Sequence, residues 1–544
     1  MPYENHKSTT ADDMSMESLV LRTDALFSDY ARRDSPGCAL AVVKDGGIAY
    51  KQGYGLASLE FEVPIIPSTI FHVASVSKQF TAMAIAMLGH EGKISLEDDI
   101  RKYLSELHDF GEKITVRDLV HHTSGLRDQW SLAMQAGWRM DDVITMDDIM
   151  ELVSSQRELN FKPGSEYLYS NTGYTLLAMI VERASGKPFP SFCKERMFQL
   201  LGMRDTHFHL DHRQIVKNRA YSYSSDNEKG FRKAVLSYAN VGATSLFTTV
   251  EDLALWDRNF YTAAVGGKEV LDMMHTQGTL NDGRQIRYAF GLNIGEYRGI
   301  KTVEHGGSDA GYRTTITRFP DQKFSIIILS NLASVNPSQL GKKVADIWLE
   351  EEFPEKQVEP ELAAKVEPDI LKSLTGIYHN TSIHATHRII YKEGRLYTEP
   401  GTDIELLPLT QERFYTRQLG PDTIIHFKPS QTPQKKQLHI QTPGDPPVIY
   451  QQKEPHDPTE TEKTEYKGTY YSPELDTKYY VNLEDGKLQL KRRKYGKVPL
   501  IPTFKDAFTL ATNEIFFLRD LKDTITGFKL TTGRVRNLRF TREE

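Results

Sequence analysis

The stretch HVASVSKQFTAMAIAML at residues 72–88 decides how the rest of this chain is interpreted. It places a lysine, Lys78, three positions after a serine, Ser75, and continues into an apolar, strongly helical segment. A serine at the start of a helix lies beside unpaired backbone N–H groups and the positive end of the helix dipole. Both stabilise the anion that forms when a hydroxyl attacks a carbonyl. The lysine lies one turn further along, on the same face. We therefore predict that Ser75 is a nucleophile and that Lys78 accepts its proton.

This interpretation needs a particular state of the lysine and support from elsewhere in the chain. Lys78 can accept a proton only when it is neutral, which requires burial or a nearby positive charge. A serine and a lysine at this spacing also occur by chance, because a second pair is present at Ser191 and Lys194. That pair lies inside an ordinary amphipathic helix pattern, so we expect no catalytic role for it.

Two later motifs supply groups that such a nucleophile needs. Tyr169 and Asn171 stand at the start of a helical pattern. A tyrosine can relay protons where cationic neighbours lower its pKa, and an asparagine amide can bind a substrate carbonyl or position the lysine. In the motif HGGS at 305–308, the glycines let a substrate approach the backbone and the next N–H can point at an oxyanion. Taken alone, the first motif also fits a helix cap beside a core tyrosine, and the second fits a simple turn.

Composition and charge exclude several classes of protein. The chain has 544 residues, 39% hydrophobic and 26% charged, which indicates a globular protein of several domains. A net charge of −6 argues against nucleic-acid binding. Neither a membrane-spanning apolar run nor a signal-peptide pattern is seen. We expect a cytoplasmic protein whose two cysteines, Cys38 and Cys193, are reduced and packed as small hydrophobic residues, although a trimmed secreted form would look the same.

The strand and helix patterns indicate a mixed domain followed by β-rich segments. Strands are expected at 38–43, 48–54, 288–294, 314–319 and 324–329, and helices at 16–30, 171–184, 190–201 and 340–349. Strands at both ends with helices between them predict one antiparallel sheet plus a helical lobe, an α+β arrangement. After an acidic, proline-containing stretch that follows Glu350, the pattern changes to short strands separated by turn residues, which is typical of a sandwich or barrel.

The β-rich part contains an internal repeat. GIY at 376–378 returns as GTY at 468–470, and EGRL at 393–396 returns as DGKL at 485–488 after the same number of positions. Matched segments in the same order favour two related β-domains. The predicted division is a flexible N-terminus at 1–14, a catalytic domain at 15–351, a first β-barrel at 365–451 and a second β-barrel at 465–544.

The three motifs, in this order, resemble those of the penicillin-recognising serine hydrolases, and above all the branch of class C β-lactamases, D,D-carboxypeptidases and family VIII esterases. VRDLVHHTSGL at 116–126 and LGM at 201–203 resemble that branch too. The layout with two terminal β-domains is similar to that of bacterial D-stereospecific aminopeptidases, with matches in SGLRD at 124–128 and YYSPELD at 470–476. The resemblance implies a β-lactamase-like catalytic domain followed by two antiparallel, lipocalin-like β-barrels.

The resemblance also implies how the first two motifs would act. Ser75 would be the nucleophile and Lys78 the base that activates it. Tyr169 would pass the proton to the leaving group and activate the water of deacylation, and Asn171 would hold the substrate amide.

The third motif would complete the site. His305 would help to set Tyr169 and contact the substrate, Gly307 would leave room for the substrate, and the amides of Ser75 and Ser308 would form the oxyanion hole. Histidine at the position where other members carry lysine resembles aminopeptidases and esterases more than efficient β-lactamases.

We therefore expect a serine hydrolase that acts through a covalent acyl-enzyme on small amides or peptides containing D-amino acids. A carboxylesterase or weak β-lactamase on the same domain, and a non-catalytic binding protein, stay open as alternatives. In the similar aminopeptidases a loop of the last barrel restricts the cleft to substrates with a free amino terminus. The corresponding stretch here, 516–526, looks too short for this, so N-acetylated substrates are expected to react nearly as well. Asp520 and Asp523 would be the first suspects for a group that excludes them.

Neither a metal nor another cofactor is expected. His121 and His122 suggest a metal site, but they stand at a predicted helix end without carboxylate or cysteine partners. The expected partner is a small-molecule or short-peptide substrate, with no nucleic acid and no membrane. The sequence leaves the natural substrate and the formation of a homo-oligomer undecided.

Overall fold

The computed structural model describes residues 11–354, 366–399, 403–416, 418–419, 423–430, 435–442, 445–511 and 513–543. The chain forms two compact units. Unit 1 comprises Met1–Gln129, Met140–Ser154 and Phe161–Lys356, and unit 2 comprises Trp130–Arg139, Ser155–Asn160 and Gln357–Glu544. Residues 1–10 of the N-terminus predicted to be flexible, and 355–365 of the predicted linker, lie outside the described residues. The domain boundaries drawn from the sequence stay a prediction.

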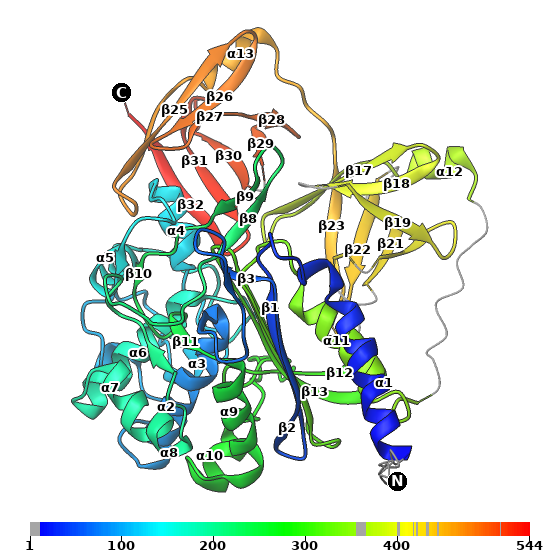
Figure 1. Ribbon diagram of the computed structural model, residues 1–544. Helices are drawn as coiled ribbons and strands as arrows, with labels where there is room; N and C mark the ends of the chain where they lie inside the picture. The colour runs from blue at the N-terminus through cyan, green and yellow to red at the C-terminus, as the bar shows by residue number, and fades with distance from the viewer. Residues whose placement is uncertain are drawn as a thin grey trace, which may run out of the picture. The chain divides into compact units, whose positions relative to one another are not determined.

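Unit 1 is built on a six-stranded antiparallel sheet (Figure 1). Its strands lie in the order β12 (Asn293–Tyr297), β13 (Ile300–Asp309), β14 (Tyr312–Phe319), β15 (Phe324–Ser330), β1 (Cys38–Lys44) and β2 (Gly47–Tyr54). β1 and β15 pair along their full length, and all their residues except Lys44 are buried. Continuous apolar runs such as CALAVV and FSIIIL form strands that are covered on both faces.

Helices cover both faces of this sheet, as Figure 1 shows. α1 (Ala11–Leu26) packs against α11 (Pro337–Trp348), and α11 packs against β14 and β15. There Val344 joins Leu40 and Ile328 in one apolar cluster. α9 (Val250–Thr262) packs against β1 and β15. Asp257 of α9 accepts a hydrogen bond from Ser325 of β15. Ser325 is three positions before Ile328, so the two side chains point to opposite faces of the sheet.

A helical lobe carries most of the candidate site. α2 (Lys78–His90) packs against α6 (Asn171–Ser185), and residues 78–88 and 171–181 of these helices are buried. A small antiparallel sheet is formed by β5 (Phe71–His72), β11 (Leu246–Thr248) and β7 (His207–Phe208). Its first strand, β5, comes directly before the turn that holds Ser75 in the chain. Across the described residues, none of the helices has both the length and the apolar character needed to cross a bilayer.

Short elements complete unit 1. They are β3 (Leu56–Ser58), β4 (Val63–Pro64), α3 (Val116–Val120), β6 (Ile144–Thr145), α5 (Met146–Ser154), α7 (Phe189–Cys193), a π-turn (Lys194–Phe198), α8 (Gln199–Leu201), β8 (Tyr223–Asp226), β9 (Gly230–Lys233), β10 (Tyr238–Ala239) and α10 (Gly267–Met274). The helix predicted at 190–201 is therefore interrupted by the π-turn, although it ends at Gly202 as expected.

Two local predictions are wrong. The strand predicted at 288–294 begins only at Asn293, because Gly291 has a φ of 68° and bends the chain against the backbone of Lys78. The HGGS motif precedes the strand pair β14 and β15, but the alternative of a simple turn is wrong, because the motif lies inside β13, where Gly307 pairs with Thr314.

Unit 2 contains two antiparallel barrels, and it also includes most of α4 (Gln129–Ala136). The first is a closed barrel of β16 (Gly376–Asn380), β17 (Ala385–Lys392), β18 (Arg395–Glu399), β19 (Ile404–Pro408), β20 (Arg413–Thr416), β21 (Thr423–Pro429), β22 (Lys436–Gln441) and β23 (Val448–Lys453), preceded by α12 (Pro368–Ser373). After α13 (Glu460–Glu465), the second is a nine-stranded sheet of β24 (Gly468–Ser472), β25 (Thr477–Glu484), β26 (Lys487–Arg492), β27 (Gly496–Pro499), β28 (Ile501–Pro502), β29 (Ala507–Leu510), β30 (Asn513–Arg519), β31 (Ile525–Thr532) and β32 (Val535–Arg542).

The repeat seen in the sequence is visible in both barrels. β27 and β28, consecutive in the chain, stand at the two ends of the second sheet, so it is nearly closed. At equivalent positions, the Tyr378 hydroxyl donates to Leu374 O (2.9 Å) and the Tyr470 hydroxyl donates to Tyr466 O (2.7 Å). The α+β catalytic fold and the two antiparallel barrels predicted from the sequence are confirmed.

Candidate active site

Ser75 lies in a tight 3-10 turn, Ala74–Ser77, that leads into α2. Ala74 has a φ of 47°, a left-handed conformation that costs a non-glycine residue energy and is concentrated at functional sites. Ala74, Val76 and Ser77 are buried, whereas Ser75 is partly exposed. The Ser77 hydroxyl donates to Ala74 O (2.5 Å) and accepts from the N–H of Leu246 (3.0 Å). The turn is thus fixed by one hydrogen bond within it and by one from β11.

Lys78 is buried at the first turn of α2. Its Nζ donates to Ser75 Oγ (3.1 Å), to Asn171 Oδ1 (2.8 Å) and to the carbonyl of Ala243 (2.7 Å). The helical spacing therefore brings the lysine within hydrogen-bond reach of the serine, as the sequence suggested. The two fixed acceptors come from α6 and from the loop before β11.

Asn171, the first residue of α6, is oriented by a carboxylate that sequence reasoning had not assigned. Its backbone N–H and its Nδ2 each donate to Asp128 Oδ2 (2.8 Å). Because Nδ2 faces an acceptor and Oδ1 faces the amine of Lys78, the orientation of the amide is unambiguous. Asp128 belongs to the SGLRD stretch, whose resemblance to the aminopeptidases was the available signal.

Tyr169 lies in an aromatic cluster near the lysine. Lys78 Nζ is 5.0 Å from the centre of the Tyr169 ring, and the His122 ring is 4.2 Å from it. His122 Nδ1 also accepts a hydrogen bond from the backbone N–H of Ser170 (3.1 Å). His122 thus supports the Tyr169–Asn171 segment, a role that the sequence did not reveal.

His305 projects from β13 into the buried part of the site. Its Nδ1 lies 2.6 Å from Gly306 O, and its Nε2 lies 2.9 Å from the hydroxyl of Tyr288. Because a carbonyl can only accept, Nδ1 carries the proton and Nε2 accepts from Tyr288. Burial and then the positive charge of Lys78 lower the pKa of His305 to about 3, so the ring is neutral near pH 7. The rings of His305 and Tyr169 lie 6.3 Å apart.

The end of β13 packs against the turn that carries Ser75. A Cβ atom on Gly307 would lie 2.3 Å from Val73 O and 2.4 Å from Thr314 Oγ1, so glycine is required for this close approach. Thr314 Oγ1 donates to the same carbonyl, Val73 O (3.0 Å). Ser308, the next residue, is exposed. Gly307 and Ser308 are therefore brought to the Ser75 turn, as the motif order suggested.

The remaining candidate residues lie on the surface or are packed in the core. Ser191 is exposed on α7, and His121 is buried with its Nδ1 3.3 Å from Tyr288 O and a pKa lowered to about 4 by burial. Among the described residues, no three histidine, cysteine, aspartate or glutamate side chains gather to hold a metal ion. Cys38 and Cys193 are free and buried.

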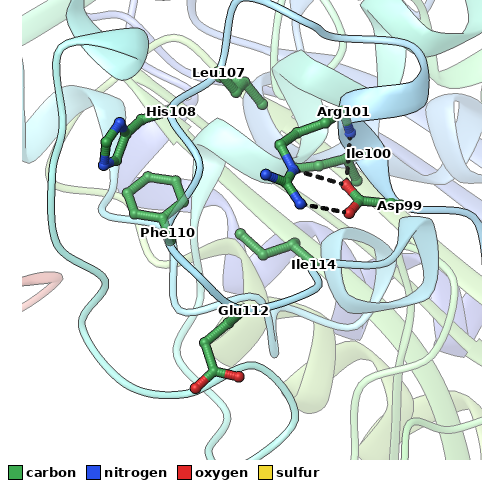
Figure 2. Close-up of a pocket in the computed structure, with 8 residues that line it drawn as sticks. All are labelled: Asp99, Ile100, Arg101, Leu107, His108, Phe110, Glu112 and Ile114. Carbon is green, nitrogen blue, oxygen red and sulfur yellow. Dashed lines mark hydrogen bonds and ion pairs between the residues drawn. The ribbon is translucent and has the colours of Figure 1, made fainter.

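A pocket elsewhere in unit 1 offers little chemistry. It is shown in Figure 2 and is lined by Asp99, Ile100, Arg101, Leu107, His108, Phe110, Glu112 and Ile114. Asp99 and Arg101 are hydrogen-bonded to each other (3.0 Å), and Arg101 also pairs with Asp109. The charges of Asp99 and Arg101 are therefore paired with each other.

Comparison with known proteins identifies the family of the catalytic domain. A model of the beta-lactamase family matches residues 23–346. A D-aminopeptidase of Gluconobacter oxydans (strain 621H) is 27% identical over 316 residues, which are 58% of this chain and 59% of that protein. The chain thus spans about three fifths of the length of that curated relative.

Two solved structures share this fold, and the first covers more of the chain than the family match. The octameric penicillin-binding protein homologue from Pyrococcus abyssi has a TM-score of 0.56 and 26% identity, covering 80% of this chain and all of its own. The D-amino acid amidase from Ochrobactrum anthropi SV3 has a TM-score of 0.52 and 21% identity, covering 62% of this chain and 99% of its own. The second comparison shows a shared fold.

Proposed function

We propose, from the premise that this chain belongs to the beta-lactamase family, that it is a serine hydrolase that cleaves small D-amino-acid amides and short peptides through an acyl-enzyme on Ser75. The observation that carries the proposal is the set of hydrogen bonds from Lys78 Nζ to Ser75, Asn171 and Ala243. The D-aminopeptidase relative and the D-amino acid amidase neighbour support the substrate class.

The first step follows from the geometry around Lys78. A neutral amine keeps two N–H donors and one lone pair. In that state Asn171 Oδ1 and Ala243 O accept the two donors. The 3.1 Å contact with Ser75 Oγ then reverses its direction, and the lone pair accepts from the Ser75 hydroxyl. The Ser75 proton then moves to Lys78 Nζ while Ser75 Oγ forms a bond to the substrate carbonyl carbon. Asp128 Oδ2 accepts a hydrogen bond from Asn171 Nδ2 and so keeps Asn171 Oδ1 facing Lys78 Nζ.

Later steps use the remaining motifs. The backbone N–H groups of Ser75 and Ser308 stabilise the oxyanion. Tyr169 passes the proton from Lys78 to the leaving nitrogen as the carbon–nitrogen bond breaks. In deacylation it relays a proton from the attacking water to the neutral Lys78, which returns it to Ser75 Oγ as the ester bond breaks. His305, held neutral and hydrogen-bonded to Tyr288, positions this corner of the site without exchanging protons near pH 7. Neither a metal nor a cofactor enters the proposed chemistry.

A labelling experiment tests the nucleophile. A fluorophosphonate probe should label the wild type and the Ser191→Ala variant alike, whereas Ser75→Ala should abolish both labelling and turnover. The Lys78→Ala variant and the Ser75/Lys78 double variant should be similarly inactive, because groups that act as a unit give strongly non-additive losses. Normal activity in Ser75→Ala would contradict the proposal.

A substrate panel tests the reaction class. We expect D-alanine p-nitroanilide to have a higher kcat/KM than its L-enantiomer and than nitrocefin. A carboxylesterase or weak β-lactamase would instead favour p-nitrophenyl butyrate or nitrocefin. If neither label nor substrate reacts, the chain is a binding protein and the proposal is wrong.

We further propose a homo-oligomer in the cytoplasm. The octameric state named for the Pyrococcus abyssi homologue supports the oligomer, and the two free, buried thiols fit a reducing compartment. Light scattering on the purified chain measures the assembly, and a monomeric mass would contradict it.

A further inference from the structure

Asp309 is a carboxylate at the edge of the site that neither the motifs nor the sequence comparison singled out. It ends β13, directly after Ser308. Side chains alternate along a strand, so Asp309 lies on the same face of the sheet as Gly307, the face that packs against Val73 and Ala74. Its side chain is 15% exposed. The carboxylate is therefore directed towards the Ser75 turn and is still accessible.

Two buried partners fix this carboxylate through one oxygen. His72 Nε2 lies 2.9 Å from Asp309 Oδ2, and the hydroxyl of Thr244 donates to the same atom. Every side-chain hydrogen bond that Asp309 makes to the described residues ends on Oδ2, so Oδ1 can accept from a further donor. Both partners are buried. Hydrogen bonds to a carboxylate are strong, so these two donors hold its orientation.

The same partners belong to the segments that build the candidate site. His72 is three residues before Ser75 on the same chain segment. Thr244 follows Ala243, whose carbonyl accepts a hydrogen bond from Lys78. Asp309 is thus hydrogen-bonded to the segment that leads to Ser75 and to the residue that follows the lysine acceptor.

Electrostatics place Asp309 near the rest of the site. Burial and then the negative charges of Asp309 and Asp128 raise the pKa of Tyr238. Tyr238 therefore lies close enough to both carboxylates to be affected by their charges. Asp128 in turn holds Asn171. Arg313 is a nearby cation, but its guanidinium donates to the carbonyls of Ala310 (3.1 Å) and Tyr312 (2.7 Å).

We infer that Asp309 binds the free α-ammonium group of the substrate and so selects substrates with an unblocked amino terminus. The inference rests on the proposed function. In an aminoacyl amide the ammonium nitrogen is two bonds from the carbonyl carbon that the serine attacks. Its binding group therefore lies close to the reacting carbonyl, and Asp309 is adjacent in sequence to Ser308, one of the proposed oxyanion donors.

This assignment replaces the candidates that the sequence suggested. Asp520 and Asp523 lie in the tight turn between β30 and β31 of unit 2. There Asp520 Oδ1 accepts from the backbone N–H groups of Lys522 and Thr524. The inference also reverses the expectation that N-acetylated substrates react nearly as well.

Comparison of two substrates on two variants tests the inference. The wild type should prefer D-alanine p-nitroanilide over its N-acetyl form. Asp309→Asn, which keeps shape and hydrogen bonding, should lower kcat/KM for the free amine by about tenfold to a hundredfold, the range for one hydrogen bond to a charged group. Turnover of the N-acetyl substrate should change by less than about threefold. Asp211→Asn, an exposed carboxylate of the same unit, is the control for net charge.

The outcomes separate the inference from the proposed function. Equal losses on both substrates would make Asp309 a structural residue and overturn the inference, and so would a wild type without preference for the free amine. Fluorophosphonate labelling of Asp309→Asn at the wild-type rate shows that the Ser75 machinery is intact. A wild type that neither labels nor turns over any substrate would overturn the proposed function, and the inference with it.

Discussion

Replacement of Gly307 by alanine should disable the site with little effect on the rest of the fold. The added Cβ would lie 2.3 Å from Val73 O and 2.4 Å from Thr314 Oγ1, against ordinary contacts of 3.4 Å or more. Val73 O is a backbone atom that also accepts from Thr314 Oγ1 and from the N–H of Val76. Relief of the overlap therefore requires the end of β13 and the Ser75 turn to separate by about 1 Å.

The magnitude follows from that displacement. Overpacking of this kind costs about 1–3 kcal/mol of stability. A 1 Å misplacement of catalytic groups can cost about a hundredfold in rate. We therefore expect Gly307→Ala to remain folded and to lose about a hundredfold in kcat/KM, because the oxyanion donors of Ser75 and Ser308 no longer converge.

The neighbouring glycine provides a matched control. A Cβ on Gly306 would meet nothing closer than Thr314 O at 3.5 Å, so Gly306→Ala should stay within about twofold of the wild type. The assay is kcat/KM on the best substrate of the panel, with the rate of fluorophosphonate labelling and the thermal midpoint alongside. A Gly307→Ala enzyme with more than about a third of wild-type activity, or a Gly306→Ala enzyme that loses as much, would refute the reasoning.

Two further predictions concern stability. Arg318 Nε and Asp257 Oδ1 form a fully buried ion pair (2.7 Å), so Arg318→Met should lower the free energy of unfolding in urea by about 3–5 kcal/mol. The control is Arg183→Met, which removes an exposed pair with Glu106 and should cost at most about 1 kcal/mol. Equal losses in the two variants would contradict this prediction. Burial lowers the pKa of His121 to about 4, below its unfolded value of about 6.5, so the unfolded chain binds the proton first. The free energy of unfolding should therefore fall as the pH falls from about 6.5 to about 4, and His121 should contribute up to about 1.4 kcal/mol per pH unit to this fall. The His121→Gln variant should show a smaller dependence of stability on pH. An unchanged dependence would disprove the role of His121.

Local patterns predicted the parts of the fold that local chemistry controls. The hairpin of β1 and β2 was placed within a residue at each end, because the Asp45-Gly46 turn adopts positive φ values of 51° and 76°, which these residues tolerate. The Ser75–Lys78 contact followed from helical spacing alone. The two barrels followed from an internal repeat, which needs no knowledge of packing.

Elements that depend on distant partners were not predictable from one sequence. HGGS has the composition of a turn, and only the fit of Gly307 against Val73 O explains why it continues a strand. YAFGL at 288–292 has the composition of a strand, but Gly291 bends against Lys78 and Tyr288 reaches His305.

The single polar residues of the site were missed for the same reason. Asp128 binds Asn171, and Asp309 binds His72 and Thr244, across long stretches of chain. No periodicity or motif marks such residues, because their partners are set by tertiary packing.

The charges around Ser75 decide between an amidase and a β-lactamase. The third motif carries His305, which is neutral near pH 7, so it offers no cation to the carboxylate of a β-lactam. Asp309 adds a negative charge on the face that packs against the Ser75 turn. Like charges repel and opposite charges attract, so this charge disfavours an anionic substrate and favours a cationic one. Asp309→Asn should therefore raise kcat/KM for the anionic substrate nitrocefin while it lowers kcat/KM for the cationic D-alanine p-nitroanilide. A general loss of activity cannot move the two substrates in opposite directions, so a parallel fall in both would show that the charge of Asp309 does not select the substrate.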